Sequence, residues 1–150
     1  MAAERTRIRR PEDIYGVVKP WAARREENFL TVTLNGVHEV IKVHHITKGL
    51  VNRTIVHPRE CFYPVIKDYA SSVIFVHNHP SGNLTPSGED KNITDRLCMA
   101  GSILGFNVID HIIIGPRGGF FSFRMEGAIR EDFSQAEKRE FVGYMAAEGK

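Results

Sequence analysis

The residues best suited to chemistry lie close together in the sequence, as His77-Asn78-His79 followed by Ser87 and Asp90. The apolar run at residues 72–76 predicts a buried strand that leads directly into the two histidines. Side chains two apart on a strand point to the same face, so both imidazoles should project together from the strand end. Imidazole is a common zinc ligand. The pair alone is compatible with a metal site and with an ordinary polar strand end.

The acidic residue that could complete a metal site lies at the start of the next predicted element, a helix from about residue 86 to 104. Ser87 and Asp90 are three apart and share one face of its first turn. Asp90 and Ile93 are also three apart, and Ile93 belongs to the expected core face, so Asp90 should point inward. Two histidines and a carboxylate leave a fourth position open for water, as in catalytic zinc sites. Asp90 alone could instead be a helix-start acid favoured by the dipole.

Strands and helices alternate along the rest of the chain. The pattern predicts strands at 29–35, 37–46, 72–76, 106–114 and 120–123, and helices from residue 11, at 58–70, at 86–104 and at 134–147. Asn35-Gly36 is a strong signal for a two-residue hairpin. Pro64 predicts a kink or a late start in the second helix. The fold class is therefore α/β (α+β), a mixed β-sheet flanked by helices.

Composition and charge limit the function classes. With 150 residues, 42% of them hydrophobic and 25% charged, the chain suits one soluble globular domain. No apolar run is long enough to span a membrane, there is no signal-peptide pattern, and Cys61 and Cys98 form no CxxC pair. We therefore expect a cytoplasmic protein with reduced, buried cysteines and no membrane partner.

The net charge of +2 is too small to indicate a nucleic-acid partner, but residues 1–25 hold seven basic and three acidic side chains. A basic arm can bind phosphates, although a solvated tail is the simpler interpretation. We divide the chain into a basic N-terminal tail (1–10), a central domain (11–130) and a polar C-terminal helix (131–150).

The stretch HNHPSGNLTPSGED resembles the signature of JAB/MPN (JAMM) metalloproteins, and in particular of the RadC-like family. The resemblance also takes in HPRE at 57–60, TDRL at 94–97, DHIIIG at 110–115 and FSF at 121–123, and it covers roughly residues 8 to 127. It implies a JAB/MPN-like fold with a cytidine-deaminase-like layout. Larger RadC-like proteins also carry a helix-hairpin-helix region, and we expect this chain to correspond to the JAB domain alone.

The resemblance also implies roles for individual residues. Zinc (Zn²⁺) would be held by His77, His79 and Asp90, and the hydroxyl of Ser87 would steady an oxyanion. An upstream glutamate would act as general acid/base; Glu27 matches best, but Glu26 is adjacent and strand parity alone does not choose between them. The implied activity is that of a zinc metallohydrolase that cleaves amide or isopeptide bonds with a zinc-activated water. Its peptide or isopeptide substrate is not identified by the sequence.

Other functions stay open. A zinc deaminase is excluded because H-x-E and P-C-x-x-C are both missing. Some JAB/MPN domains are scaffolds without the ligands, whereas this chain keeps all of them. The alternative is a DNA-repair-associated factor or metal-dependent nuclease, with weak DNA binding through the basic N-terminus. Asp110-His111 could support the metal ligands or be a buried structural pair.

Overall fold

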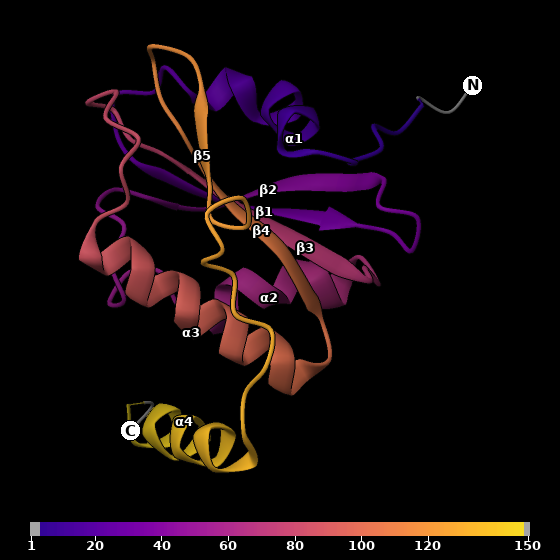
Figure 1. The fold of residues 1–150 in the computed structure, drawn as a ribbon, viewed down its shortest axis with the longest axis vertical. Coiled ribbons are helices and arrows are strands. Elements are labelled where there is room, and N and C mark those ends of the chain that lie inside the picture. The colour runs from indigo at the N-terminus through magenta and orange to yellow at the C-terminus, as the bar shows by residue number, and fades with distance from the viewer. Residues whose placement is uncertain (1–3, 149–150) are drawn as a thin grey trace.

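A five-stranded mixed sheet, in the order β2-β1-β3-β4-β5, forms the middle of the computed structural model, which describes residues 4–148 (Figure 1). β1 is antiparallel to both of its neighbours, β3 and β4 are parallel, and β5 is antiparallel to β4. The mixed sheet predicted from the sequence is confirmed. The strands are β1 (Asn28–Leu34), β2 (Val40–Lys48), β3 (Ser72–Asn78), β4 (Asn107–Ile114) and β5 (Phe120–Ser122).

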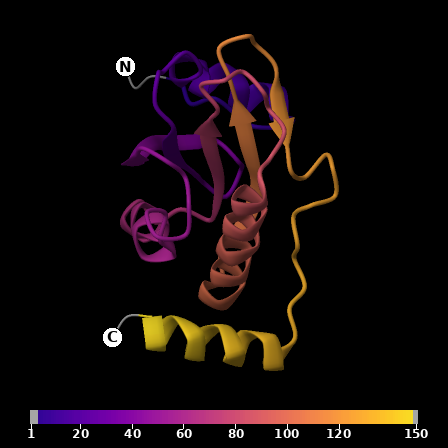
Figure 2. The ribbon, with the colours of Figure 1, turned by 90° about the vertical axis from the view of Figure 1, so that its left-hand side faces the viewer.

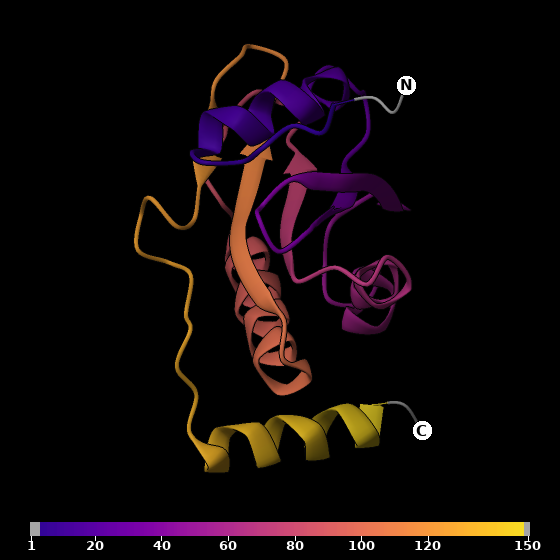
Figure 3. The same cartoon turned by 90° about the vertical axis from the view of Figure 1, so that its right-hand side faces the viewer.

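Helices cover both faces of this sheet (Figures 2 and 3). α1 (Pro11–Val18) packs on one face with the short 3₁₀-helix η1 (Lys19–Trp21) after it, and its Ile14 and Val18 join an apolar cluster with β1, β3 and β4. α2 (Pro58–Lys67) and α3 (Gly88–Leu104) pack on the other face, where the free thiols of Cys61 and Cys98 are buried. The three layers explain why β1 and β3, in the centre, are buried along their whole length.

α3 connects the parallel strands β3 and β4, as a parallel pair requires. It ends at Gly105, whose φ of +85° is the left-handed conformation that glycine adopts without strain. α4 (Gln135–Glu148) follows an extended segment and crosses beneath α3 in Figures 2 and 3, with no residue fully buried. Among residues 4–148, no helix combines the length and the apolar character needed to cross a bilayer.

Two local expectations were wrong. The β1–β2 connection is a five-residue loop, because the side-chain oxygen of Asn35 accepts hydrogen bonds from the backbone N–H groups of Val37 and Glu39. The positive φ then falls on His38 (+61°) and not on Gly36. The second helix starts at Pro58, the first residue of its predicted range, so the late start expected from Pro64 is wrong. His57 caps this start by accepting the N–H of Arg59 at 3.0 Å, and the helix ends at Lys67.

The N-terminal segment is not a free tail at residues 6–8. Arg7 forms an antiparallel bridge with Glu39, the N–H of Ile8 donates to His38, and the N–H of Val40 donates to Thr6. Ile8 is 7% exposed and packs in the α1 core. The prediction of a solvated tail is therefore wrong for these residues, while the part of it that concerns residues 1–3 lies outside the described residues.

Candidate metal centre

Three side chains from two neighbouring elements converge at the C-terminal end of β3. His77 is the penultimate residue of the strand, His79 follows the strand directly, and Asp90 lies in the first turn of α3. His77 Nε2 is 3.1 Å from His79 Nε2 and 3.2 Å from Asp90 Oδ1, and His79 Nε2 is 3.0 Å from Asp90 Oδ2. The structure therefore brings together the three side chains that the sequence singles out as metal ligands.

The loop between β3 and α3 brings the start of the helix back beside the two histidines. The N–H of Gly82 donates to the carbonyl of His79 at 3.0 Å, which closes a tight turn in which Gly82 has a φ of +84°. Ser87 then caps α3: its hydroxyl accepts the N–H of Asp90 at 3.0 Å, and Asp90 Oδ2 accepts the N–H of Ser87 at 2.9 Å. This reciprocal cap holds the Asp90 carboxylate in place beside the histidines.

The three groups present lone pairs to one another. His79 Nδ1 is 2.7 Å from the carbonyl oxygen of Asn83, which can only accept, so Nδ1 carries the hydrogen and Nε2 of the neutral ring does not. Asp90 contributes a carboxylate that is 2% exposed. Acceptors this close repel one another unless a cation lies among them. The cluster therefore has the chemistry of a cation site.

The spacing fits a tetrahedral metal ion. Bond lengths of 2.0–2.1 Å imply ligand atoms about 3.3 Å apart in a tetrahedral zinc site. The nearest approaches between the three ligand groups are 3.0 to 3.2 Å, with the two histidines next to different oxygens of Asp90. One ligand atom from each residue lies within 4.8 Å of the other two. Two imidazole nitrogens and one carboxylate oxygen also leave one position free for water or substrate. The residues present can therefore hold a divalent metal ion in a catalytic type of site.

The ionisation of the ligands agrees with a site for a cation. Burial alone would raise the pKa of the Asp90 carboxyl, but the imidazoles of His77 and His79 beside it outweigh burial and hold that pKa well below its usual value. The hydrogen bond with Asp90 raises the pKa of His79, with a smaller contribution from the charge of Glu27. The Asp90 carboxyl is therefore ionised at neutral pH, as a metal ligand has to be.

The two glutamates before β1 face different surroundings. The Glu26 side chain is 59% exposed and lies 3.6 Å from Lys48 Nζ. The partly buried Glu27 accepts the N–H of Val51 at 2.7 Å through Oε2, and its charge reaches His79. Glu27 is therefore the glutamate on the metal side of the strand.

Asn78, between the two histidines, has a structural task that the sequence did not reveal. Its Oδ1 accepts the N–H of Asn28 at 2.6 Å, and its Nδ2 donates to the carbonyls of Glu26 at 2.9 Å and Arg24 at 3.3 Å. It thereby ties the segment that carries Glu27 to the end of β3. The only signal available was an amide side chain within a strand that is otherwise apolar.

The side chains of Asp110 and His111 have different partners. Of the two interpretations that the sequence allowed, support of the metal ligands describes His111 and a buried structural role describes Asp110. Asp110 accepts the hydroxyl of Ser122 and the N–H of Arg124, which joins β4 to the segment after β5. His111 Nε2 lies 2.8 Å from His77 Nδ1, directly behind the metal ligand. Burial lowers the pKa of His111 well below its usual value, so its ring is neutral. His111 therefore supports a ligand, whereas Asp110 supports the fold.

Comparison with known proteins agrees with this geometry. The family model of the RadC-like JAB domain matches residues 8–128, which is most of the chain. The chain belongs to the RadC-like JAB family. The matched range contains every ligand described above as well as Glu27 and His111.

Relatives of this RadC-like JAB domain occur in bacteria and archaea. A UPF0758 protein of Trichlorobacter lovleyi is 50% identical over 105 residues, which are 70% of this chain and 45% of that protein. A UPF0758 protein of Methanospirillum hungatei is 47% identical over 126 residues, or 83% of this chain and 56% of that protein. The chain thus spans about half the length of the curated relatives that it matches.

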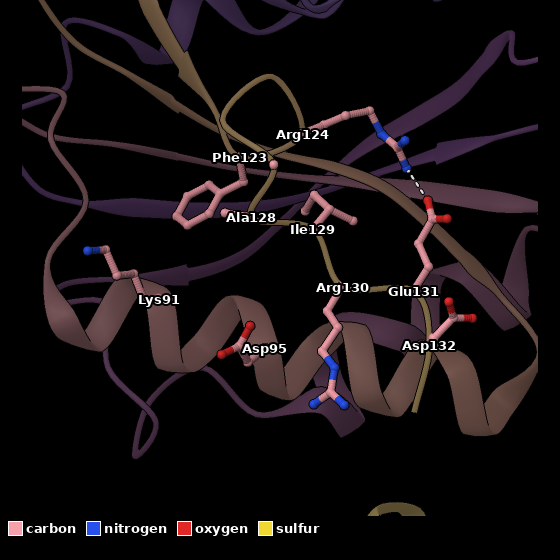
Figure 4. A pocket seen from close by; sticks show the side chains of 10 residues that line it. Lys91, Asp95, Phe123, Arg124, Ala128, Ile129, Arg130, Glu131 and Asp132 are labelled. Atoms are coloured by element: carbon pink, nitrogen blue, oxygen red, sulfur yellow. Dashed lines mark hydrogen bonds and ion pairs between the residues drawn. The ribbon is translucent and has the colours of Figure 1, made fainter. Parts of the chain in front are cut away.

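A cleft of about 820 Å³ lies between α3 and the segment 123–132 of the JAB domain (Figure 4). None of the three candidate metal ligands lines this cleft, although Phe123 at its edge stacks on His111 with ring centroids 4.8 Å apart. Arg124 pairs with Glu131 at 2.8 Å, as Figure 4 shows. The charged residues that line it are balanced in sign: Lys91, Arg124 and Arg130 against Asp95, Glu131 and Asp132.

Proposed function

We propose that this RadC-like JAB domain is a zinc-dependent hydrolase that cleaves amide or isopeptide bonds. The observation that carries the proposal is the cluster of His77, His79 and Asp90, whose nearest approaches are 3.0 to 3.2 Å. A zinc ion held by these three ligands would keep a fourth position for water. Glu27 lies on the same side of the sheet, where a general base is needed. Membership of the JAB family, which is commonly hydrolytic, supports the same reaction class.

In the proposed reaction, the metal ion and Glu27 have separate roles. When bound, zinc lowers the pKa of a water to about 7 and polarises a carbonyl. Glu27 takes the proton of the attacking water and passes it to the leaving nitrogen. Only Oε2 of Glu27 accepts a hydrogen bond within residues 4–148, and so Oε1 is available for that proton.

Ser87 supplies a donor for the developing negative charge. Its hydroxyl oxygen already accepts the N–H of Asp90, which orients the oxygen at the start of α3. In the described part of the chain no acceptor takes the hydroxyl hydrogen, which is therefore free to be donated to an oxyanion. The N-terminal end of α3 adds its dipole to the same effect.

The small net charge of the chain, +2, favours a peptide over DNA as the substrate. A nucleic-acid groove needs excess positive charge to neutralise phosphates. The cleft between α3 and the segment 123–132 has no such excess either, because three basic and three acidic side chains line it. A main chain with mixed side chains suits such a surface better.

The metal is tested first, by elemental analysis of protein purified without chelator. We expect one zinc per chain in the wild type and loss of zinc in Asp90→Ala, which removes one of the three ligands. A circular dichroism spectrum of both forms checks that the variant is folded. Wild type without metal, or Asp90→Ala with a full complement of zinc, would show that the ligand assignment is wrong.

The reaction is tested with a panel of peptides, isopeptide-linked peptides, single-stranded DNA and duplex DNA, each with and without added zinc. We expect zinc-dependent cleavage of a peptide or isopeptide bond that a chelator abolishes. Cleavage of DNA alone would replace the proposal with the nuclease alternative.

A further inference from the structure

A chain of buried hydrogen bonds runs from α3 through β4 to the first metal ligand. Thr94 Oγ1 is 2.7 Å from the carbonyl oxygen of Asp90 and 2.6 Å from His111 Nδ1. His111 Nε2 is in turn 2.8 Å from His77 Nδ1. Thr94 is 2% exposed, and both imidazoles are fully buried. No solvent therefore competes for these polar atoms, and each hydrogen has to serve a partner within the chain.

The direction of every hydrogen bond in this chain follows from its first contact. A carbonyl oxygen can only accept, so the single hydroxyl hydrogen of Thr94 goes to Asp90. Thr94 Oγ1 must then accept from His111 Nδ1–H. The neutral ring of His111 has no second hydrogen, so its Nε2 accepts from His77 Nδ1–H. Nε2 of His77 is left with a lone pair, which faces His79 and Asp90.

The opposite arrangement leaves a clash. If His111 carried its hydrogen on Nε2, the hydroxyl of Thr94 would have to turn toward His111 Nδ1. Two acceptors, Thr94 Oγ1 and the Asp90 carbonyl, would then face each other at 2.7 Å with no hydrogen between them. His77 would also carry its hydrogen on Nε2, where it would block a metal ion.

Aromatic packing holds the two rings in these orientations. Phe123 stacks on His111 with an interplanar angle of 11°, and Phe29 meets the edge of the same ring with a centroid distance of 5.6 Å. Phe29 also lies against His77 with an interplanar angle of 16°. Ring flips that would exchange the two nitrogens therefore require repacking of a core side chain.

We propose that Thr94 and His111 are positioning residues that fix His77 as the Nδ1–H tautomer and so present its Nε2 lone pair to the metal. The inference rests on the metal site of the proposed function but not on hydrolysis. Partners that fix the tautomer of a ligand histidine typically contribute 10- to 100-fold to metal affinity. Thr94 touches neither His77 nor His79, so it reaches His77 through His111. Because Thr94 also donates to the backbone carbonyl of Asp90, the tautomer of His77, and not zinc affinity alone, is the readout that reports the route through His111.

Two readouts test the inference without an activity assay. Long-range proton–nitrogen NMR correlations of zinc-loaded wild type report which ring nitrogen of each histidine carries hydrogen. We expect hydrogen on Nδ1 in both His77 and His111. Competition with a chromophoric chelator then measures the zinc affinity of Thr94→Val, which keeps the shape of the side chain but loses its hydroxyl. We expect its affinity to fall by about 10- to 100-fold.

Thr94→Ser is the matched control, because it restores the hydroxyl and should keep both the tautomers and an affinity close to that of wild type. A purely structural role would lower the melting temperature of metal-free Thr94→Val while leaving its zinc affinity unchanged, and that result would overturn the inference. Hydrogen on Nε2 of His111 in zinc-loaded wild type would overturn it as well, even if Thr94→Val fails to fold. If the protein hydrolyses no substrate but His77 and His111 carry hydrogen on Nδ1, the inference is supported and only the proposed hydrolase function is contradicted.

Discussion

At the scale of single residues, the position of the proposed general base, Glu27, depends on the pairing of two strands. Phe29 of β1 lies opposite His77 of β3 in the antiparallel register. Continuing that register by two residues places Glu27 opposite His79. Glu27 then shares a face with both ligand histidines, and Glu26 points to the opposite face. The contacts agree, because Glu26 pairs with the exposed Lys48.

Replacing Glu27 by glutamine should lower the turnover of the protein without lowering its zinc content. Glu27→Gln keeps the shape of the side chain and does not remove a ligand, so the protein should keep its zinc. Turnover of whichever substrate the panel identifies should fall by roughly two to four orders of magnitude, the usual contribution of a positioned general acid/base. Initial rates and elemental analysis of the same preparation measure the two effects.

Glu26→Gln is the matched control for that substitution. It removes a neighbouring carboxylate whose exposed pair with Lys48 contributes about 1 kcal/mol at most. We expect nearly full activity. Loss of activity in Glu26→Gln but not in Glu27→Gln would show that Glu26, and not Glu27, is the general base. If neither substitution matters while zinc is retained, the JAB mechanism does not apply.

At the scale of elements, α3 has to approach the sheet closely for Asp90 to reach the histidines. The approach is tightest at Gly101, where a Cβ would lie 2.9 Å from Val108 Cγ2 and 3.1 Å from the carbonyl oxygen of Phe106. The carbonyl of Phe106, in the turn before β4, cannot move aside without shifting the backbone that leads into the strand. A glycine at this position therefore sets the distance between helix and sheet.

Gly101→Ala should destabilise the protein despite the better helix propensity of alanine. Overpacking costs about 1–3 kcal/mol, of which the gain in propensity returns up to about 1 kcal/mol. Gly143→Ala in α4 is the control, because a Cβ there meets nothing within 4 Å. Its unfolding free energy, from urea titration, should equal or slightly exceed that of wild type. Equal stability of the two variants would contradict the close approach.

The pair His44–Asp68 joins β2 to the end of α2 and should make stability depend on pH. Burial would raise the pKa of the Asp68 carboxyl, but hydrogen bonds from His44 at 2.6 Å and Thr33 at 2.7 Å lower it below its usual value. A lowered folded pKa contributes stability above the unfolded pKa of about 3.9 and loses it as the pH falls through the folded value. The difference in unfolding free energy between wild type and Asp68→Asn should therefore shrink below about pH 4. A difference that stays constant from pH 6 to pH 3 would contradict this role.

At the scale of the whole molecule, the docking of residues 6–8 changes how DNA binding has to be tested. Deleting the N-terminal segment would remove Ile8 from the core together with the charges. The side chains of Arg5, Arg7 and Arg9 are exposed, so they can be replaced without disturbing that packing.

We expect only weak DNA binding, and it should decline steeply with salt because phosphate contacts release counterions. Replacing Arg5, Arg7 and Arg9 together by glutamine should weaken it further and flatten the salt dependence, as measured by fluorescence anisotropy. Replacing Lys67, Lys138 and Arg139 removes the same charge elsewhere and should have a smaller effect. Tight, sequence-selective binding that survives loss of the three arginines would show that DNA recognition lies on another surface.

Local periodicity in the sequence predicted where each candidate ligand points, and the resemblance to the JAB/MPN signature grouped the three into one zinc site. The face shared by His77 and His79 follows from the two-residue period of a strand, and the inward direction of Asp90 follows from its spacing to Ile93. The order of strands and helices followed from the same patterns. These features depend on residues at most four apart within one element, and such spacings can be read from a single chain.

Only the tertiary structure decided between alternatives that depend on pairing across long distances. The choice of Glu27 over Glu26 required the register of β1 against β3, which joins residues 48 apart in the sequence at Phe29 and His77. The separate roles of Asp110 and His111 required the place of β4 beside β3. The pattern of residues within one strand does not reveal how that strand pairs with its neighbour. A shift of the pairing by one residue exchanges the two faces of the strand while its sequence stays the same.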